Sequence, residues 1–199
     1  INTLPGAAEI AYILEHSGAR MLLVDPELAP ALDGVLGGID TLERVIEVAD
    51  GSVCAREGAA TYDDFLSGAE VLPIESHLED ENTLLSINYT SGTTGRPKGV
   101  MFSHRGGALN ALGQISAHEL SKRTTFLWTL PMFHCNGWCM PWAVTGAAGV
   151  HVCLRAIDPP EVFRLIDEHG VTHFNGAPTV LLMLGSDPAA EGRRFDPPI

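Results

Sequence analysis

The chain has 199 residues, 45% of them apolar, so it is long enough to bury a core of ordinary domain size. Its 25 acidic and 12 basic residues give a net charge of −13, which repels nucleic acids and anionic lipid surfaces and argues against them as partners. No run of 18 or more apolar residues predicts a transmembrane segment.

The predicted elements alternate between helix and strand. At the N-terminal end, an apolar stripe predicts a helix between Pro5 and Gly18, and the run RMLLVD predicts a strand that is buried on both faces. Further helices are predicted at 27–36, 62–66, 106–120, 159–170 and 178–184. Further strands are predicted at 44–48, 84–89, 125–129, 149–154 and 171–176. This order predicts an α/β fold of mostly parallel sheets flanked by helices.

The cysteine content predicts a cellular location, and the first residue predicts that the chain is part of a longer protein. Four cysteines are too sparse for a disulfide framework, and no signal peptide precedes them, so we expect a reducing, cytoplasmic location. The first residue is Ile1 rather than Met, and a helical pattern begins directly after it. We therefore expect the chain to be one incomplete domain of a longer protein.

A glycine-rich loop follows the predicted strand at 84–89, with the sequence YTSGTTGRPKGV. Its glycines let backbone amides approach a bulky ligand, while hydroxyl side chains and Lys98 supply donors and charge that suit phosphate oxygens. The loop is not a Walker A motif, because Arg96 and Pro97 separate Gly95 from Lys98, and it contains no G-x-G-x-x-G. A surface turn without a ligand is the alternative, but such a turn needs about one glycine rather than three around a lysine.

Two stretches resemble a known family. The glycine-rich loop is similar to the phosphate-loop signature of the adenylate-forming (AMP-binding) enzymes. The segment LPMFHCNGWCMPW, followed by GVHVCLR and VTHFNGAPTVLLML, resembles the acyl-CoA synthetase (fatty-acid–CoA ligase) branch, most closely its members for short- and medium-chain or related small acids. The resemblance implies that residues 1–199 are an incomplete large N-terminal domain of an acyl-CoA synthetase-like fold, without the small C-terminal domain.

The resemblance also implies a reaction and a set of site residues. ATP would activate a fatty or other small carboxylic acid as an acyl-adenylate, and coenzyme A would accept the acyl group. The implied nucleotide-binding residues are Thr90, Ser91, Gly92, Thr93, Thr94, Gly95 and Lys98. The implied catalytic residues are His134 and Lys98, and the implied acyl-pocket residues are Phe133, His134, Asn136, Gly137 and Trp138. We expect the Mg²⁺ ligand outside this chain, no metal site within it, and no adenylation by these 199 residues alone.

Other interpretations remain open at this point. From the residues alone His134 is more typical of a packed histidine at a strand-to-helix junction, and only the resemblance favours a functional role; Trp138 and Trp142 have the i, i+4 spacing of a helix core. Cysteines and histidines between His134 and Cys153 could suggest zinc, but their apolar neighbours favour buried thiols. The functional alternatives are an acyl-AMP ligase that feeds a carrier protein and a non-catalytic nucleotide-binding homologue. Acyl chain length and oligomeric state stay open.

Overall fold

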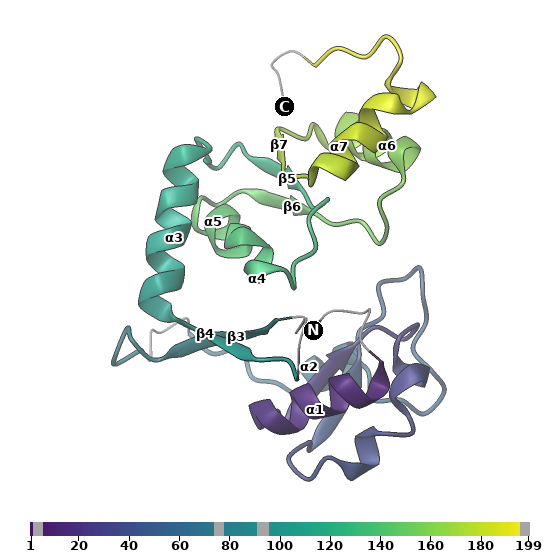
Figure 1. The fold of residues 1–199 in the computed structure, drawn as a ribbon, viewed down its shortest axis with the longest axis vertical. Helices are drawn as coiled ribbons and strands as arrows, with labels where there is room; N and C mark the ends of the chain where they lie inside the picture. The colour runs from purple at the N-terminus through teal and green to yellow at the C-terminus, as the bar shows by residue number, and fades with distance from the viewer. Residues whose placement is uncertain (2–5, 74–77, 91–95, 196–199) are drawn as a thin grey trace. The chain divides into compact units, whose positions relative to one another are not determined.

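A computed structural model describes residues 1, 6–73, 78–90 and 96–195. It divides into two compact units, the first made of Ile1–Asp80 with Tyr89–Val100 and the second of Glu81–Asn88 with Met101–Ile199. Strands β1 to β7 form sheets in both units, and the order of helices and strands along the chain can be followed by colour in Figure 1. The predicted α/β class is confirmed.

The first unit is built on a parallel pair of strands. α1 (Ala7–Ser17) ends at Gly18, which takes φ 66° and donates its amide to the Glu15 carbonyl at 3.0 Å. β1 (Met21–Val24) pairs in parallel with β2 (Arg44–Glu47), and α2 (Tyr62–Ser67) follows, capped by Thr61. The core of this unit contains Leu14, Leu22, Val24, Ala29, Leu32 and Ile39.

Two expectations for the first unit are wrong. Residues 27–36 do not form one α-helix but two short 3-10 turns, η1 (Ala29–Leu32) and η2 (Leu36–Gly38). Pro30 lacks a backbone donor, and Gly34 loses more conformational entropy than other residues when it becomes helical. A longer helix is therefore not stable there. β1 is buried on one face only, since Leu22 and Val24 are buried whereas Met21 and Leu23 are exposed.

A second two-stranded sheet joins β3 (Leu84–Tyr89) to β4 (Gly99–Ser103). β4 runs directly into α3 (His104–Ala117), because the hydroxyl of Ser103 accepts a hydrogen bond from the Gly106 amide at 3.1 Å. This cap starts α3 two residues before the predicted position. The helix ends at Ala117 rather than near Leu120.

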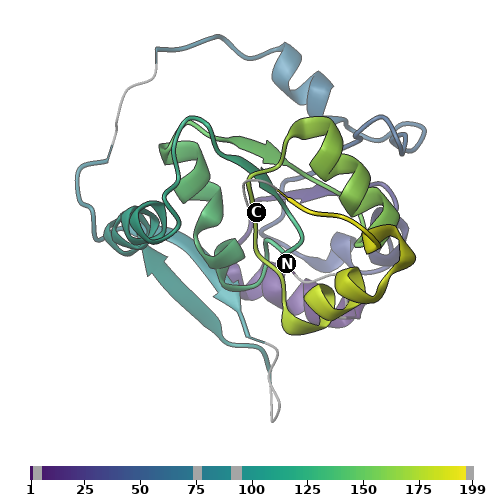
Figure 2. The same ribbon diagram turned by 90° about the horizontal axis from the view of Figure 1, so that it is seen from above.

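The second unit contains a parallel three-stranded sheet in the order β6 (Val150–Val152), β5 (Thr125–Leu127), β7 (His173–Phe174). Its helices are α5 (Met140–Gly146), α6 (Pro159–His169) and α7 (Pro178–Ser186), followed by η3 (Pro188–Ala190). Asp158 caps α6, and Gly170 ends it at φ 59°. Figure 2 shows α3 almost end-on, beside α5.

Two cores cover the two faces of this sheet. Consecutive side chains of a strand point to opposite faces, and here Phe126 joins one core while Leu127 joins the other. The Phe126 core contains residues of α3 and α5, and the Leu127 core contains residues of α6 and Leu184 of α7. Helices therefore cover both sides of β5. None of the helices in the described residues is long and apolar enough to cross a membrane.

Candidate functional site

The glycine-rich loop is described at its two ends. Ser91, Gly92, Thr93, Thr94 and Gly95 lie outside the described residues. We call the flanking residues 89–90 and 96–98 the loop stem. Its two sides meet where the Thr90 amide donates to the Lys98 carbonyl at 3.0 Å, and the Lys98 amide lies 3.5 Å from the Thr90 hydroxyl oxygen. The structure thus brings two predicted site residues together and leaves the Lys98 side chain exposed.

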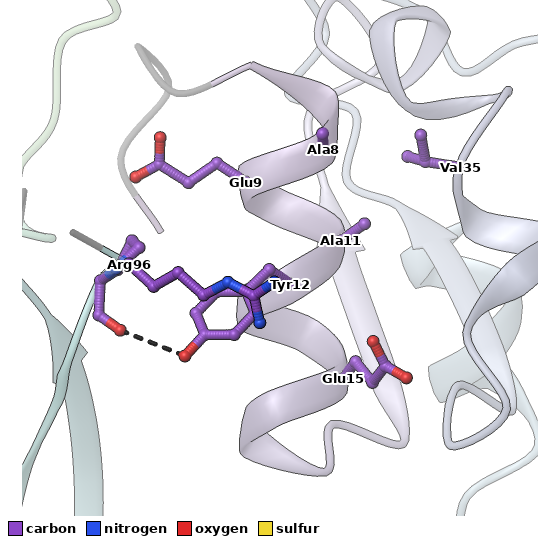
Figure 3. A pocket seen from close by; sticks show the side chains of 8 residues that line it. Ala8, Glu9, Ala11, Tyr12, Glu15, Val35 and Arg96 are labelled. Atoms are coloured by element: carbon purple, nitrogen blue, oxygen red, sulfur yellow. Dashed lines mark hydrogen bonds between the residues drawn. The ribbon is translucent and has the colours of Figure 1, made fainter.

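Helix α1 contacts both sides of the loop stem. Tyr12 and His16 are one turn apart and therefore lie on the same helix face. The Tyr12 hydroxyl donates to the Pro97 carbonyl at 3.4 Å, as the dashed line in Figure 3 shows, and His16 Nδ1 lies 2.7 Å from the Tyr89 hydroxyl. Sequence reasoning missed both residues, although polar rings at i, i+4 within an otherwise apolar helical stripe were a usable signal.

Aromatic contacts add to this attachment. The Arg96 guanidinium carbon lies 5.3 Å from the centroid of the Tyr12 ring, within cation–π range. The His16 ring meets the Tyr89 ring edge-on, with centroids 5.8 Å apart. Burial raises the pKa of Tyr89, so its phenol stays protonated near neutral pH.

A pocket of about 650 Å³ borders the loop stem on the α1 side. Its lining consists of Ala8, Glu9, Ala11, Tyr12, Glu15, Val35, Arg96 and Pro97, most of which are labelled in Figure 3. Its charged side chains are Glu9, Glu15 and Arg96, and this net negative charge makes the lining unfavourable for polyphosphate, because like charges repel. We therefore do not place the nucleotide in this pocket.

The predicted acyl-pocket residues lie in the second unit, around a left-handed turn. Residues 135–139 all have positive φ, between 49° and 62°. This left-handed turn includes the short helix α4 (Cys135–Trp138) and leads directly into α5. His134 stands immediately before the turn and is exposed, rather than packed as the alternative interpretation expected. Left-handed geometry is costly for residues other than glycine, so tertiary contacts must support it.

Two asparagines connect the turn region to β3. Asn136 donates its Nδ2 to the Ser86 hydroxyl at 3.0 Å, and Asn88 donates its Nδ2 to the Phe133 carbonyl at 3.1 Å. The Oδ1 atom of Asn88 is buried and has no hydrogen-bond partner among the described residues. A buried acceptor of this kind is costly unless a water or ligand donates to it. Neither Ser86 nor Asn88 was recognised from the sequence.

Two expectations about this segment need correction. Trp138 and Trp142 do not form a helical i, i+4 pair, because Trp138 and Cys139 have left-handed φ. Trp138 is 48% exposed, whereas Trp142 packs against the core between α3 and α5. Among the predicted buried thiols only Cys139 is buried, and burial raises its pKa; Cys135 and Cys153 are exposed. No group of three or more His, Cys, Asp or Glu side chains suited to a metal ion occurs in the described ranges.

Comparisons with known proteins identify the family. The model of the AMP-binding enzyme family matches residues 1–196. The chain belongs to the AMP-binding enzyme family. It is 39% identical over 207 residues to a peroxisomal butyrate–CoA ligase of Arabidopsis thaliana, with 98% of this chain and 35% of that protein covered.

Two further similarities agree with this assignment. A 4-hydroxybutyrate–CoA ligase of Metallosphaera sedula is 35% identical over 188 residues, with 92% of this chain and 34% of that protein covered. The crystal structure of ATP-bound MatB of Rhodopseudomonas palustris is 25% identical with a TM-score of 0.73, and the match covers 94% of this chain and 35% of that one. The chain spans about a third of the length of these relatives.

Proposed function

We propose that the full-length protein is an AMP-forming carboxylic acid–CoA ligase that acts on a fatty or other small carboxylic acid. Residues 1–199 would form part of its large N-terminal domain. Family membership and the two CoA ligases among the relatives support the proposal. The observation that carries it is the loop stem, in which Thr90 and Lys98 are hydrogen-bonded across the base of a glycine-rich loop and the lysine side chain is exposed.

The reaction is written in two steps. A carboxylate oxygen of the acid attacks the α-phosphorus of ATP, the bond to the bridging oxygen breaks, and pyrophosphate leaves. The thiolate of coenzyme A then attacks the acyl carbon and AMP leaves, so atoms and charge balance. Both reactants of the first step are anions, and catalysis therefore depends on charge neutralisation and alignment.

We assign the first task to the glycine-rich loop. Lys98 would neutralise the β- and γ-phosphates and the leaving pyrophosphate, while the amides and hydroxyls of Thr90, Ser91, Gly92, Thr93, Thr94 and Gly95 would donate to phosphate oxygens. Mg²⁺, when bound, would neutralise further phosphate charge. The described residues offer no cluster of acidic side chains for it, and we propose that its ligands lie elsewhere in the protein.

We assign the second task to the segment before and within the left-handed turn. The exposed ring of His134 would donate an N–H to the substrate carboxylate or the acyl-adenylate. Phe133, Asn136, Gly137 and Trp138 would form part of the pocket wall. The exposure of His134 and Trp138 supports this assignment, since a ligand can reach both side chains.

Pyrophosphate release tests the proposal. Lys98→Ala and Thr93→Ala in the full-length protein are each expected to lower carboxylate-dependent pyrophosphate release by about 100-fold, a typical cost of removing one transition-state donor. Lys122→Ala is the matched control, because Lys122 is the other lysine of the chain and is also exposed. Unchanged release in Lys98→Ala would refute the role of the loop.

The acyl acceptor and the location need separate measurements. Acyl transfer to coenzyme A is expected; transfer to a carrier protein alone would instead make the protein an acyl-AMP ligase, and absence of both would make it a non-catalytic homologue. We also propose a cytoplasmic location, supported by the free thiols of Cys54, Cys135 and Cys153. Several relatives, including the butyrate–CoA ligase, are peroxisomal, so imaging of the tagged full-length protein decides between the compartments.

A further inference from the structure

Trp128 packs directly behind the left-handed turn. It follows β5 and is 5% exposed. A Cβ atom at Gly137 would lie 2.7 Å from Cζ3 and 2.9 Å from Cη2 of the Trp128 ring. The indole edge therefore occupies the space that a side chain at position 137 would need. Its position sets how closely the turn can approach β5.

His151 on β6 fixes the orientation of this indole. Trp128 Nε1 donates to His151 Nδ1 at 3.0 Å, and the two ring planes are only 15° apart. An indole N–H can only donate, so Nδ1 must carry a lone pair and the imidazole proton must be on Nε2. That N–H then donates to the Thr145 hydroxyl of α5, 3.0 Å away. Burial lowers the pKa of His151, which favours the neutral imidazole that this arrangement requires.

A second contact links the turn to β3, where Asn136 donates a hydrogen bond to Ser86. The turn is thus supported by a polar contact at Asn136 and by the Trp128 ring at Gly137. Because four of its five residues are not glycine, its left-handed backbone is unfavourable at each of those four positions. Loss of either support is expected to let the backbone relax.

We infer that Trp128 and His151 form a positioning pair that holds the left-handed turn in the conformation that presents His134 and Trp138 to the acyl group. The pair does not touch the reacting atoms and acts through the contact of Trp128 with Gly137. The inference rests on the proposed function, because it names residues that set acid binding in the same site. It adds to the proposed pocket wall two residues of the neighbouring sheet, Trp128 after β5 and His151 on β6.

Substitutions at His151 separate positioning from folding. His151→Phe keeps a ring but removes the acceptor for Trp128, and we expect KM for the acid to rise about tenfold, equivalent to about 1.4 kcal/mol, with KM for ATP unchanged. His151→Asn retains an acceptor oxygen near the Nδ1 position and is expected to restore most of the acid affinity. His173→Phe is the matched control, because His173 lies on β7, the other neighbour of β5, and bonds to Thr172 and His118 instead.

A second measurement does not depend on activity. The full-length protein is labelled with 5-fluorotryptophan, and the ¹⁹F resonances of Trp128, Trp138 and Trp142 are assigned by single Trp→Phe substitutions. His151→Phe is expected to shift the Trp128 and Trp138 resonances and leave Trp142 in place. A shift of Trp128 alone, or equal changes in KM for acid and ATP, would overturn the inference. If no acid is activated by the unaltered protein, the proposed function fails while the ¹⁹F result still tests the pair.

Discussion

The Glu47 carboxyl group, at the end of β2, is 1% exposed. It accepts a hydrogen bond from the Arg56 backbone amide at 2.8 Å and a second one from the Arg56 Nε. These bonds, the backbone one first, hold the pKa of Glu47 below its ordinary value despite burial. The same guanidinium donates to both carboxylate oxygens of Asp33, at 2.9 and 2.8 Å. A single arginine therefore ties two segments of the first unit to β2.

Glu47→Gln is expected to destabilise the full-length protein by about 2 kcal/mol, because the amide cannot accept both charge-assisted hydrogen bonds. Urea unfolding measures the difference. Glu43→Gln is the matched control, since its carboxylate is 55% exposed and pairs with Arg20; its cost should be much smaller than that of Glu47→Gln, because solvent screens an exposed ion pair. Equal effects of the two substitutions would contradict the structural role of Glu47.

The lowered pKa of Glu47 also gives this contribution a pH dependence. A carboxyl group with a depressed folded-state pKa binds fewer protons in the folded than in the unfolded protein as the pH falls. Its stabilising contribution is present above the ordinary pKa of 4.5 and disappears as the pH falls through the lower folded value. As the pH falls below about 4.5, the free energy of unfolding should therefore decrease less for Glu47→Gln than for the unaltered protein.

Gly137 and Gly170 offer a matched test of crowding. Both have left-handed φ, 56° and 59°, but only Gly137 has atoms of Trp128 where a Cβ would stand. Gly170→Ala should cost about 1 kcal/mol of stability from backbone strain alone. Gly137→Ala should cost about 1–3 kcal/mol more, because the ring must move. Thermal unfolding distinguishes them, and equal costs would show that the contact with Trp128 does not constrain the turn.

At the level of elements, α1 does more than pack against β1, because it also contacts the loop stem. Tyr12→Phe removes the hydrogen bond to the Pro97 carbonyl and keeps the ring under Arg96. We expect KM for ATP to rise by about threefold, as for one modest hydrogen bond, with KM for the acid unchanged. Tyr62→Phe, which removes a phenolic hydroxyl from α2, serves as control. A rise in KM for the acid but not for ATP would contradict the attachment.

Elements were predictable where a strong local signal existed. The spacing of apolar residues and the flanking proline or glycine located α1, α6 and α7, and short apolar runs located the strands of both parallel sheets. The prediction of one helix at 27–36 failed because Pro30 lacks the backbone donor that a continuous α-helix needs. The left-handed turn was beyond sequence reasoning, since its φ values depend on Trp128 and Ser86, whose contacts only the folded chain creates.

In the candidate site too, local sequence signals were readable whereas tertiary contacts were not. Thr90, Lys98 and His134 were identified from motifs, because their residue types directly reflect phosphate and carboxylate chemistry. Tyr12, Asn88 and His151 were not, because each acts by contacting another residue far along the chain. Local patterns predict which groups suit a ligand, whereas the residues that support those groups are found only through tertiary contacts.

At the scale of the whole molecule, the two units contain separate cores. Leu14 belongs to the core of the first unit, and Leu127 and Leu165 share a core of the second. Leu14→Ala and Leu165→Ala should each cost about 2–5 kcal/mol and should combine additively within about 0.5 kcal/mol. Leu127→Ala with Leu165→Ala should depart from additivity by about 0.5–3 kcal/mol. Urea unfolding of the single and double variants provides the test.

The left-handed turn has a kinetic consequence. Asn136 and its partner Ser86 are 50 residues apart, and the chain between them must be ordered before this bond can offset an unfavourable backbone. The turn can therefore be stable only after β3 and β5 have assembled. We expect residues 135–139 to reach their native geometry after the rate-limiting barrier of refolding, so that substitutions there accelerate unfolding and leave the refolding rate nearly unchanged.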